Sequence, residues 1–282
     1  MYKSDLMKGR NILITGGGTG LGRSMALRFA ELGANIFLVA RRPEPLEATS
    51  KEIQAKGVKA GFASCDVRDF AAVEKAVEAG EKEIGRIDTL VNNAAGNFVA
   101  RTEKLSANAF AAVVGIVLNG TFHCTLALGR KWIEAKQPGN VLNIVTTYAS
   151  TGAGSGYVVP SSCAKAGVLA MTRSLAVEWA RYNIRFNAIA PGPFPTEGAW
   201  SRLMQSKEFE ETAIKNHPMK RFGRHDELAD LAVYLLSPQA QYINGDCVTI
   251  DGAQWLAGAG EFNEYRKLPD EMWAMIEGAR KK

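Results

Sequence analysis

The chain has 282 residues, of which 46% are hydrophobic and 22% are charged, and its formal net charge is +5. These values are ordinary for a globular protein and exclude a disordered or fibrous chain. Lys and Arg are interspersed with Asp and Glu, so no nucleic-acid partner is indicated; a site for a phosphorylated small molecule, or solubility alone, would explain the positive charge.

The cysteines and histidines form no metal-binding pattern. The four cysteines are widely spaced without a CxxC motif, and the three histidines are scattered, so we expect neither a metal site nor a disulfide framework. No apolar run reaches the roughly 18 residues of a membrane span. The first predicted strand begins too early for a signal or transit peptide, and the ending GARKK is not a peroxisomal signal. We therefore expect a soluble, cytoplasmic protein.

The first predicted strand, residues 11–15, ends in the glycine cluster GGGTGLG, and apolar residues at helical spacing follow at residues 24–34. A strand, a glycine turn and a helix in this order are typical of a nucleotide-binding site, although a plain turn is the alternative. Gly20 would let the backbone approach a pyrophosphate, and Gly22 would let the helix pack closely on the strand. The cofactor-binding residues expected here are Gly16, Gly17, Gly18, Thr19, Gly20 and Leu21.

Two arginines follow the second predicted strand, residues 34–40. An NAD-dependent enzyme would place an acidic residue here to bind the ribose 2′-hydroxyl, but Ala40 cannot do so. Arg41 and Arg42 instead suit a 2′-phosphate, which the planar guanidinium fork binds through two hydrogen bonds. We therefore predict NADPH as the cofactor. The alternative is that both arginines are solvated at the start of a loop before Pro43.

The remaining pattern alternates predicted strands and helices along the chain. Asp69 is the candidate N-cap of a helix over residues 69–84. Alternating βα units predict an α/β protein with a doubly wound Rossmann domain, a parallel sheet and helices on both faces. We expect one domain over residues 1–282, with a small helical substrate lid near residues 196–217. The seven strands are expected at residues 11–15, 34–40, 58–64, 86–91, 140–147, 183–190 and 247–252.

The segment TYASTGAGSGYVVPSSCAK, residues 147–165, carries the candidate catalytic groups. A long amphipathic helix is expected to begin near Pro160, and it places Ser161 one turn before Lys165. The run of small residues around Lys165 is unusual for a surface lysine. Tyr148 closes a predicted strand, so its phenol can project from the carboxyl end of the sheet, where open α/β sheets bind their ligands.

These motifs resemble the short-chain dehydrogenase/reductase family. The resemblance rests on TGGGTGLG, on NNAAG after the fourth strand and on the lysine of the catalytic helix. Most relatives keep a Tyr at the position of Ser161. Within that family, the chain resembles the 2,4-dienoyl-CoA reductases over nearly its full length. This resemblance rests on Tyr148 and Asn97 and on the motifs LNGTF, YVVPSSCAKAGV, RFNAIAPGPF, YINGD and GEFNEYRK.

The resemblance implies a role for each site residue. It implies that Asp66 contacts adenine, that Asn93 lines the cofactor cleft, and that Asn119 bends its helix and holds a water in a proton relay; a kinked helix alone is the alternative for Asn119. Tyr148 and Asn97 would bind the thioester oxygen, Lys165 would hold the cofactor, and Ser161 would orient Lys165. The turn beside the nicotinamide would be Pro191, Gly192, Pro193 and Phe194.

The resemblance also implies an acyl-CoA substrate and a homotetramer. Its substrate contacts would be Arg68, Phe98, Ser106 and Arg202, each of which could instead be an ordinary surface residue. The tail over residues 257–282 is a candidate for packing on a neighbouring subunit, by analogy alone.

The implied activity is the NADPH-dependent reduction of 2,4-dienoyl-CoA to 3-enoyl-CoA in the oxidation of unsaturated fatty acids. One alternative is a short-chain reductase or dehydrogenase that acts on another carbonyl or alcohol, with Tyr148 or Tyr157 as the acid. The other is a non-catalytic NADP(H)-binding relative that lost catalysis with the helix tyrosine.

Overall fold

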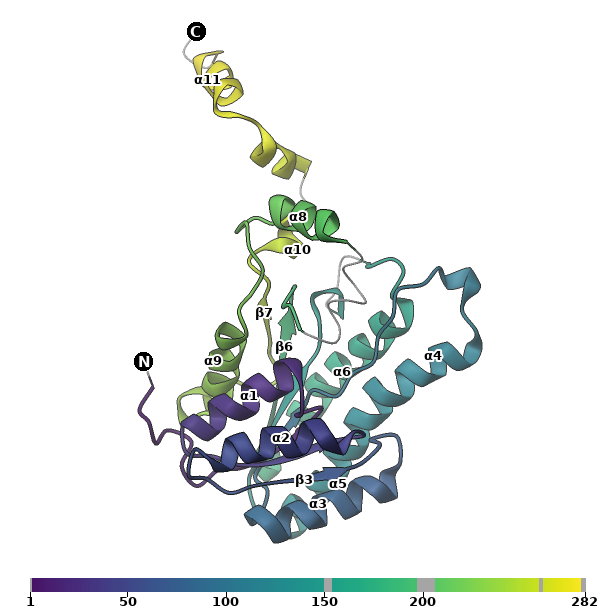
Figure 1. Ribbon diagram of the computed structural model, residues 1–282, viewed down its shortest axis with the longest axis vertical. Helices are drawn as coiled ribbons and strands as arrows, with labels where there is room; N and C mark the ends of the chain where they lie inside the picture. The colour runs from purple at the N-terminus through teal and green to yellow at the C-terminus, as the bar shows by residue number, and fades with distance from the viewer. Residues whose placement is uncertain (1, 150–153, 197–205, 259–260, 280–282) are drawn as a thin grey trace.

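A single seven-stranded parallel sheet forms the centre of the protein, with strand order β3-β2-β1-β4-β5-β6-β7 (Figure 1). The computed structural model describes residues 2–149, 154–196, 206–258 and 261–279. The predicted sheet is confirmed. The strands are β1 Asn11–Thr15, β2 Asn35–Ala40, β3 Ala60–Ser64, β4 Thr89–Asn92, β5 Gly139–Ile144, β6 Ile184–Pro191 and β7 Cys247–Ile250.

Helices cover both faces of this sheet (Figure 1). One face packs against α1, α2 and α9 through a core that includes Phe29, Leu46 and Leu228. The other packs against α3, α5 and α6 through a core that includes Phe37 and Leu128. The five inner strands are largely buried, which explains their nearly continuous apolar sequences, whereas the edge strands β3 and β7 are only partly buried. The helices are α1 Gly20–Glu31, α2 Pro43–Gln54, α3 Phe70–Ile84, α4 Ala107–Val114, α5 Gly120–Glu134, α6 Val159–Glu178, α8 Lys207–Asn216, α9 His225–Leu236, α10 Gln254–Ala257 and α11 Asp270–Ala279.

Local signals in the sequence account for several helix ends. The Asp69 side chain accepts a hydrogen bond from the Ala72 amide and so caps α3, as predicted. Helix α6 begins at Val159 with Pro160 in its first turn, where the missing N–H of proline costs nothing. This proline fixes where the helix starts, and therefore which way Ser161 and Lys165 point.

Helices α4 and α5 form one continuous stretch that is interrupted by a π turn over Gly115–Asn119. By length and composition the stretch Ala107–Glu134 could cross a membrane, with a mean hydropathy of 1.7 and 44% of the tested window buried in the fold. The apolar runs of the sequence do not predict a span of that length. Core helices pass the same test, so this observation is weak evidence for a membrane span.

The carboxyl-terminal segment leaves the sheet and extends past α8 and α10 (Figure 1). Among the described residues, Arg266 links it to the predicted lid by donating a 2.6 Å hydrogen bond to the carbonyl of Asn216, the last residue of α8. Inside the tail, the Tyr265 and Trp273 rings lie 6.0 Å apart. The Phe262 and Met275 side chains are mostly exposed.

Candidate active site

The glycine turn lies where the strand order reverses, between β1 and β4. Thr15 ends β1, and its hydroxyl accepts hydrogen bonds from the Asn93 and Ala94 amides, each 3.0 Å long. The Asn93 amide group donates in turn to the carbonyls of Thr15 and Gly16. Gly16 has φ +66, a conformation that favours glycine. Asn93 therefore holds the phosphate-binding turn rigid, and this switch point is where doubly wound sheets bind ligands.

A hollow of about 250 Å³ opens beside this turn. Arg41, Arg42 and Asp66 line it, together with Gly16, Gly18 and Thr19 of the turn. No carboxylate pairs with Arg41 or Arg42 among the described residues, so both guanidinium forks are free for an anion. Hydrogen bonds from Arg68, with a backbone contribution, lower the pKa of Asp66 and keep it charged. The predicted adenosine residues therefore do come together.

A second hollow, of about 830 Å³, adjoins the first through Gly18, Thr19 and Arg42. Thr196 lies over Gly20, because a Cβ added at Gly20 would be 3.2 Å from the Thr196 methyl carbon. Only a glycine at position 20 leaves the space between α1 and Thr196 open. The residues of the two hollows fit a dinucleotide with its pyrophosphate at the start of α1.

The predicted nicotinamide turn follows β6, which ends at Pro191. The Gly192 amide donates to the Ile250 carbonyl at 3.0 Å, which joins this turn to the end of β7. The Phe194 ring is 7% exposed and belongs to the hydrophobic core. Only the backbone of Phe194 is therefore available to a cofactor, because its side chain serves packing.

Tyr148 lies in a 3₁₀ turn over Thr147–Ala149, just past the end of β5 at Ile144. The strand is thus shorter than predicted, but the phenol still projects at the carboxyl edge of the sheet. Its hydroxyl is 3.1 Å from the Ser161 hydroxyl and accepts a 3.4 Å hydrogen bond from the Asn97 amide. Asn97 and Ser161, from two separate segments, therefore meet at the Tyr148 phenol.

The Asn97 side chain is fixed in orientation by the backbone of the next residue, Phe98. Its Oδ1 accepts a 2.9 Å hydrogen bond from the Phe98 amide, so its NH₂ group faces Tyr148. An amide NH₂ has two hydrogens, and only one is needed for the phenol. The second can donate to a substrate oxygen.

Lys165 lies one turn after Ser161 on α6, and it is 7% exposed. Its Nζ donates to the carbonyl of Ile144, at the end of β5. Burial lowers the pKa of Lys165 to about 8. No carboxylate pairs with Lys165 among the described residues, so its remaining N–H groups are available to a ligand. Ser161 was expected to orient Lys165, but the structure joins Ser161 to Tyr148 instead.

Comparisons with known proteins identify the family of this chain. The family model described as enoyl-(acyl carrier protein) reductase matches residues 16–253. The crystal structure of a short chain dehydrogenase from Bacillus anthracis is 44% identical, has a TM-score of 0.79, and covers 88% of this chain and 98% of its own. The chain belongs to the short-chain dehydrogenase/reductase family.

Two relatives in this family carry more specific names. A Bacillus subtilis (strain 168) protein named a probable 2,4-dienoyl-CoA reductase, (2E)-enoyl-CoA-producing, is 48% identical over 251 residues, covering 89% of this chain and 98% of that protein. A Caenorhabditis elegans protein named probable 2,4-dienoyl-CoA reductase 3, (3E)-enoyl-CoA-producing, is 42% identical over 259 residues, covering 90% of this chain and 83% of that protein. The chain is therefore an oxidoreductase of this family, whose fold binds a nicotinamide cofactor.

The family resemblance predicted a relay asparagine at Asn119, and the structure gives it a different setting. Asn119 is the last residue of the π turn, and its side chain is exposed rather than enclosed by the apolar helix. The helix departs from regular α geometry at this π turn, which is a recognised cause of helix distortion. The role of Asn119 in proton transfer stays a prediction.

The predicted substrate contacts are spread over several elements. Phe98 packs against the cluster that contains Val113. Arg68 is paired with Asp66 at the edge of the adenosine hollow. Ser106 is exposed and caps α4. Arg202 lies outside the described residues, as does much of the expected lid. No contact joins the three described residues, Arg68, Phe98 and Ser106.

A substitution of Ser106 would distinguish a helix cap from a substrate contact. Its hydroxyl accepts a 3.1 Å hydrogen bond from the Ala109 amide. We expect Ser106→Ala to lower the free energy of unfolding by about 1 kcal/mol and to leave KM for an acyl-CoA unchanged. Urea unfolding and steady-state kinetics measure both. A KM raised several-fold with unchanged stability would instead identify a substrate contact.

Sequence reasoning missed part of the cofactor hollow. Arg23, Thr196 and His225 line it beside the glycine turn. Thr196 could have been found from its place directly after PGPFP, the predicted nicotinamide turn. Arg23 lies on α1, the helix that begins within the glycine cluster. His225 gives no local signal, because its partners are distant in the sequence.

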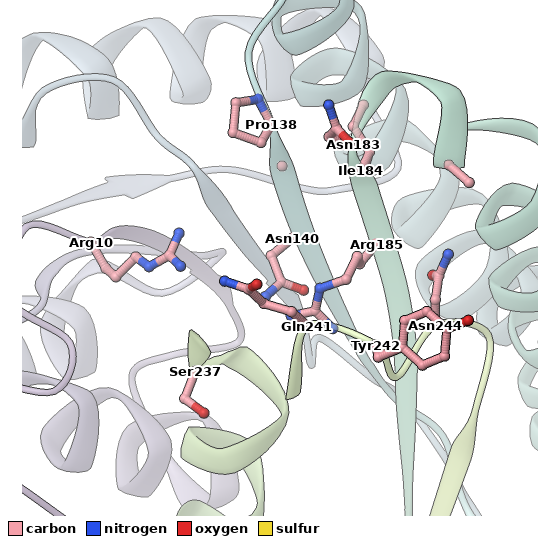
Figure 2. Close-up of a pocket in the computed structure, with 12 residues that line it drawn as sticks. Arg10, Pro138, Asn140, Asn183, Ile184, Arg185, Ser237, Gln241, Tyr242 and Asn244 are labelled. Carbon is pink, nitrogen blue, oxygen red and sulfur yellow. The ribbon is translucent and has the colours of Figure 1, made fainter. Parts of the chain in front are cut away.

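Another hollow, of about 630 Å³, lies at the opposite, amino-terminal edge of the strands (Figure 2). Figure 2 shows that two side chains point toward this hollow, those of Arg10, directly before β1, and of Arg185, on β6. Arg185 is committed to the carbonyls of Ile243 and Leu235. The Oδ1 atom of Asn140 is buried and has no hydrogen-bond partner within the described part of the chain. We assign the chemistry to the other end of the sheet, where Tyr148 and Lys165 lie. Among the described residues, no group of three His, Cys, Asp or Glu could hold a metal ion.

Proposed function

We propose that this protein reduces 2,4-dienoyl-CoA to 3-enoyl-CoA with NADPH, in the oxidation of unsaturated fatty acids. The observation that carries the proposal is the phenol of Tyr148, which stands beyond β5 with Asn97 and Ser161 around it. A family member with its tyrosine on the helix would aim an acid at a carbonyl next to the nicotinamide. A phenol placed elsewhere suits a substrate whose oxygen is remote from the carbon that is reduced.

NADPH, when bound, supplies a hydride. Addition at C5 of a dienoyl thioester moves negative charge along the conjugated chain to the thioester oxygen. Donors fixed in advance at that oxygen lower the barrier, because they need no reorganisation as charge develops. The Tyr148 hydroxyl and the free hydrogen of the Asn97 amide are two such donors. Water then supplies the proton at Cα, which leaves the double bond at C3.

The hydrogen bonds around Tyr148 leave its hydroxyl proton free to be donated to a substrate oxygen. Asn97 donates to its oxygen, and Ser161 can donate to the same oxygen. A phenol oxygen that accepts two hydrogen bonds keeps its single proton for a third partner, and neighbouring bonds in such a chain strengthen one another. Lys165 would hold the nicotinamide ribose with the N–H groups that Ile144 leaves free.

Turnover with conjugated thioesters tests the proposal directly. NADPH oxidation should be fast with a 2,4-dienoyl-CoA and slow with a 2-enoyl-CoA or a simple ketone. Reduction of NADP⁺ by an alcohol, the reverse reaction, should also be slow. The product should be identified by NMR, because relatives are named for (2E)- and (3E)-products. Turnover of ketones alone would support the carbonyl-reductase alternative, and dinucleotide binding without any turnover would support a non-catalytic role.

Cofactor preference depends on Arg41 and Arg42. We expect Arg41→Ala combined with Arg42→Ala to raise KM for NADPH roughly 10–100-fold, the cost of losing charged hydrogen bonds to a 2′-phosphate. KM for NADH should barely change. Initial rates with both cofactors measure this. Lys51→Ala is the control, because Lys51 is an exposed cation on α2 that pairs with Glu47. Equal effects on NADPH and NADH would contradict the assignment.

Three further expectations remain predictions. They are a cytoplasmic location, a homotetramer, and a single domain over residues 1–282 with the lid as part of it. Light scattering of the purified protein tests the assembly, and fractionation of the source cells tests the location.

A further inference from the structure

The hollow at the amino-terminal edge of the strands takes no part in the proposed reaction, because it lies at the opposite end of the sheet from Tyr148. Its volume of about 630 Å³ is within the usual range of small-molecule sites, about 300–1,000 Å³. Among the described residues that line it there are two arginines, Arg10 and Arg185, and no Asp or Glu. The hollow is therefore a concave surface of positive charge, which attracts anions.

Arg185 is a half-buried cation that has no carboxylate partner in the described part of the chain. Its Nη1 and Nη2 donate to the carbonyls of Ile243 and Leu235, at 2.7 and 3.2 Å. These bonds hold the end of α9 but supply no negative charge. Burial, and then the charge of Arg10, lower the pKa of Arg185, so the two guanidinium groups repel each other. A guanidinium has five N–H groups, and those that the two carbonyls leave free are available to an anion.

Arg10 approaches the hollow from the start of β1. Its Nη1 lies 3.4 Å from Oδ1 of Asp88, which is a long contact for an ion pair. The Asp88 carboxylate already accepts from the Thr89 hydroxyl at 2.6 Å and from the Asn11 amide at 3.0 Å. Asp88 does not line the hollow. Most of the Arg10 guanidinium is therefore free to bind a ligand there.

Asn140 lies between the two arginines in Figure 2 and is paired with Arg185 across β5 and β6. It is 5% exposed, and its Nδ2 donates a 3.4 Å hydrogen bond to the Leu236 carbonyl. Its Oδ1 is the unpartnered buried oxygen described above. A buried acceptor without a partner costs about 1–3 kcal/mol. A ligand that brings a hydroxyl group to Asn140 would recover this free energy.

We propose that this hollow binds the phosphate ester of a sugar, either free or as part of a nucleotide. A phosphate monoester carries about −1.5 to −2 charges at neutral pH and has three acceptor oxygens, so it suits two facing guanidinium groups better than a carboxylate does. A sugar hydroxyl would donate to Asn140. Tyr242, which lines the hollow and is fully exposed, offers a ring on which a nucleotide base can stack. The proposal does not depend on which substrate the protein reduces.

Titration calorimetry with the cofactor site occupied tests the proposal. The full-length protein is saturated with NADP⁺ or NAD⁺, whichever it binds more tightly, and is then titrated with ribose 5-phosphate, 5′-AMP or unphosphorylated ribose. We expect both esters to bind at one further site per chain and ribose not to bind. Tighter binding of 5′-AMP would support a nucleotide as the ligand, and equal binding would support a sugar phosphate. Absence of binding by both esters, or equal binding of ribose, overturns the proposal.

Arg10→Gln is the deciding variant, because Arg10 holds no helix end and its long contact with Asp88 contributes little to stability. We expect this variant to raise Kd for ribose 5-phosphate about 10–100-fold, the cost of losing charged hydrogen bonds. Arg185→Gln should have the same effect, but it also removes the bonds to α9, so Arg10→Gln carries the test should Arg185→Gln fail to fold.

Arg181→Gln is the matched control. Arg181 is a nearby exposed arginine whose guanidinium lies over the Tyr182 ring and does not line the hollow. Its substitution should change Kd by less than about twofold, because an exposed charge outside the hollow is screened by salt. Equal losses in Arg181→Gln and Arg10→Gln would show that positive charge of the general surface attracts the esters. Unchanged affinity in Arg10→Gln would place the esters elsewhere. Either result overturns the proposal.

Discussion

Tyr148→Phe is expected to lower kcat for reduction of a 2,4-dienoyl-CoA by about 10²–10³-fold, the cost of removing one donor from a developing oxyanion. The hydroxyl lies at the meeting point of Asn97 and Ser161, and the ring itself is retained in the variant. Kd for NADPH, measured by fluorescence, should stay unchanged because the phenol serves the acyl oxygen. Stopped-flow measurement of NADPH oxidation gives the rate of the chemical step.

Tyr157→Phe is the matched control for this substitution. Tyr157 is 63% exposed, and its backbone has φ +65. Its carbonyl accepts a hydrogen bond from the Ala100 amide, so the backbone is positioned without help from the phenol. We expect the variant to keep full activity. A large loss in Tyr157→Phe with full activity in Tyr148→Phe would reverse the assignment and favour the carbonyl-reductase alternative.

Lys165→Met is expected to abolish dinucleotide-dependent activity and yet to stabilise the ligand-free protein at pH 7. Burial holds the pKa of Lys165 at about 8, against 10.5 for an ordinary lysine. Keeping the charged form in the fold therefore costs about 3 kcal/mol. The lost hydrogen bond to the Ile144 carbonyl offsets about 1 kcal/mol of the gain. The free energy of unfolding should rise by about 2 kcal/mol.

The pH dependence of this gain has a definite sign. Between pH 8 and 10.5 the folded protein has released the Lys165 proton while the unfolded chain still holds it, so folding of the unaltered protein becomes more favourable as pH rises. The advantage of Lys165→Met is therefore full below pH 8 and shrinks toward pH 10.5. Urea unfolding at pH 7 and pH 10 measures it. Lys131→Met, which removes a lysine paired with Glu81 and partly exposed, should show no gain.

The sheet was predictable because each strand is a short apolar run that ends in turn residues. The site was only partly predictable. Tyr148 is 51 residues from Asn97 and 13 from Ser161, so their contact depends on the register of three segments and on no local spacing. Sequence alone indicated that Tyr148 stands at the sheet edge, but not that Ser161 bonds to the phenol.

Two other site residues show the same limit. Asn119 is exposed in the structure, and its apolar neighbours in sequence did not reveal which face the π turn presents. His225 was missed because its partners Ser24 and Pro195 are 201 and 30 residues away. Only the folded chain brings such residues together.

The π turn over Gly115–Asn119 leaves room for a change in the length of the gene. A π turn holds one residue more than a regular α turn, and each residue of an α-helix turns the chain by about 100°. Deleting a single codon within the π turn would convert it to a regular α turn and keep the downstream residues in phase, so Gly120 would keep its close approach to Val67, where an added Cβ would be 2.5 Å from a methyl group. Deleting one codon within α5 would instead rotate the residues that follow. A deep mutational scan that includes one-codon deletions should find them better tolerated in the π turn than in α5.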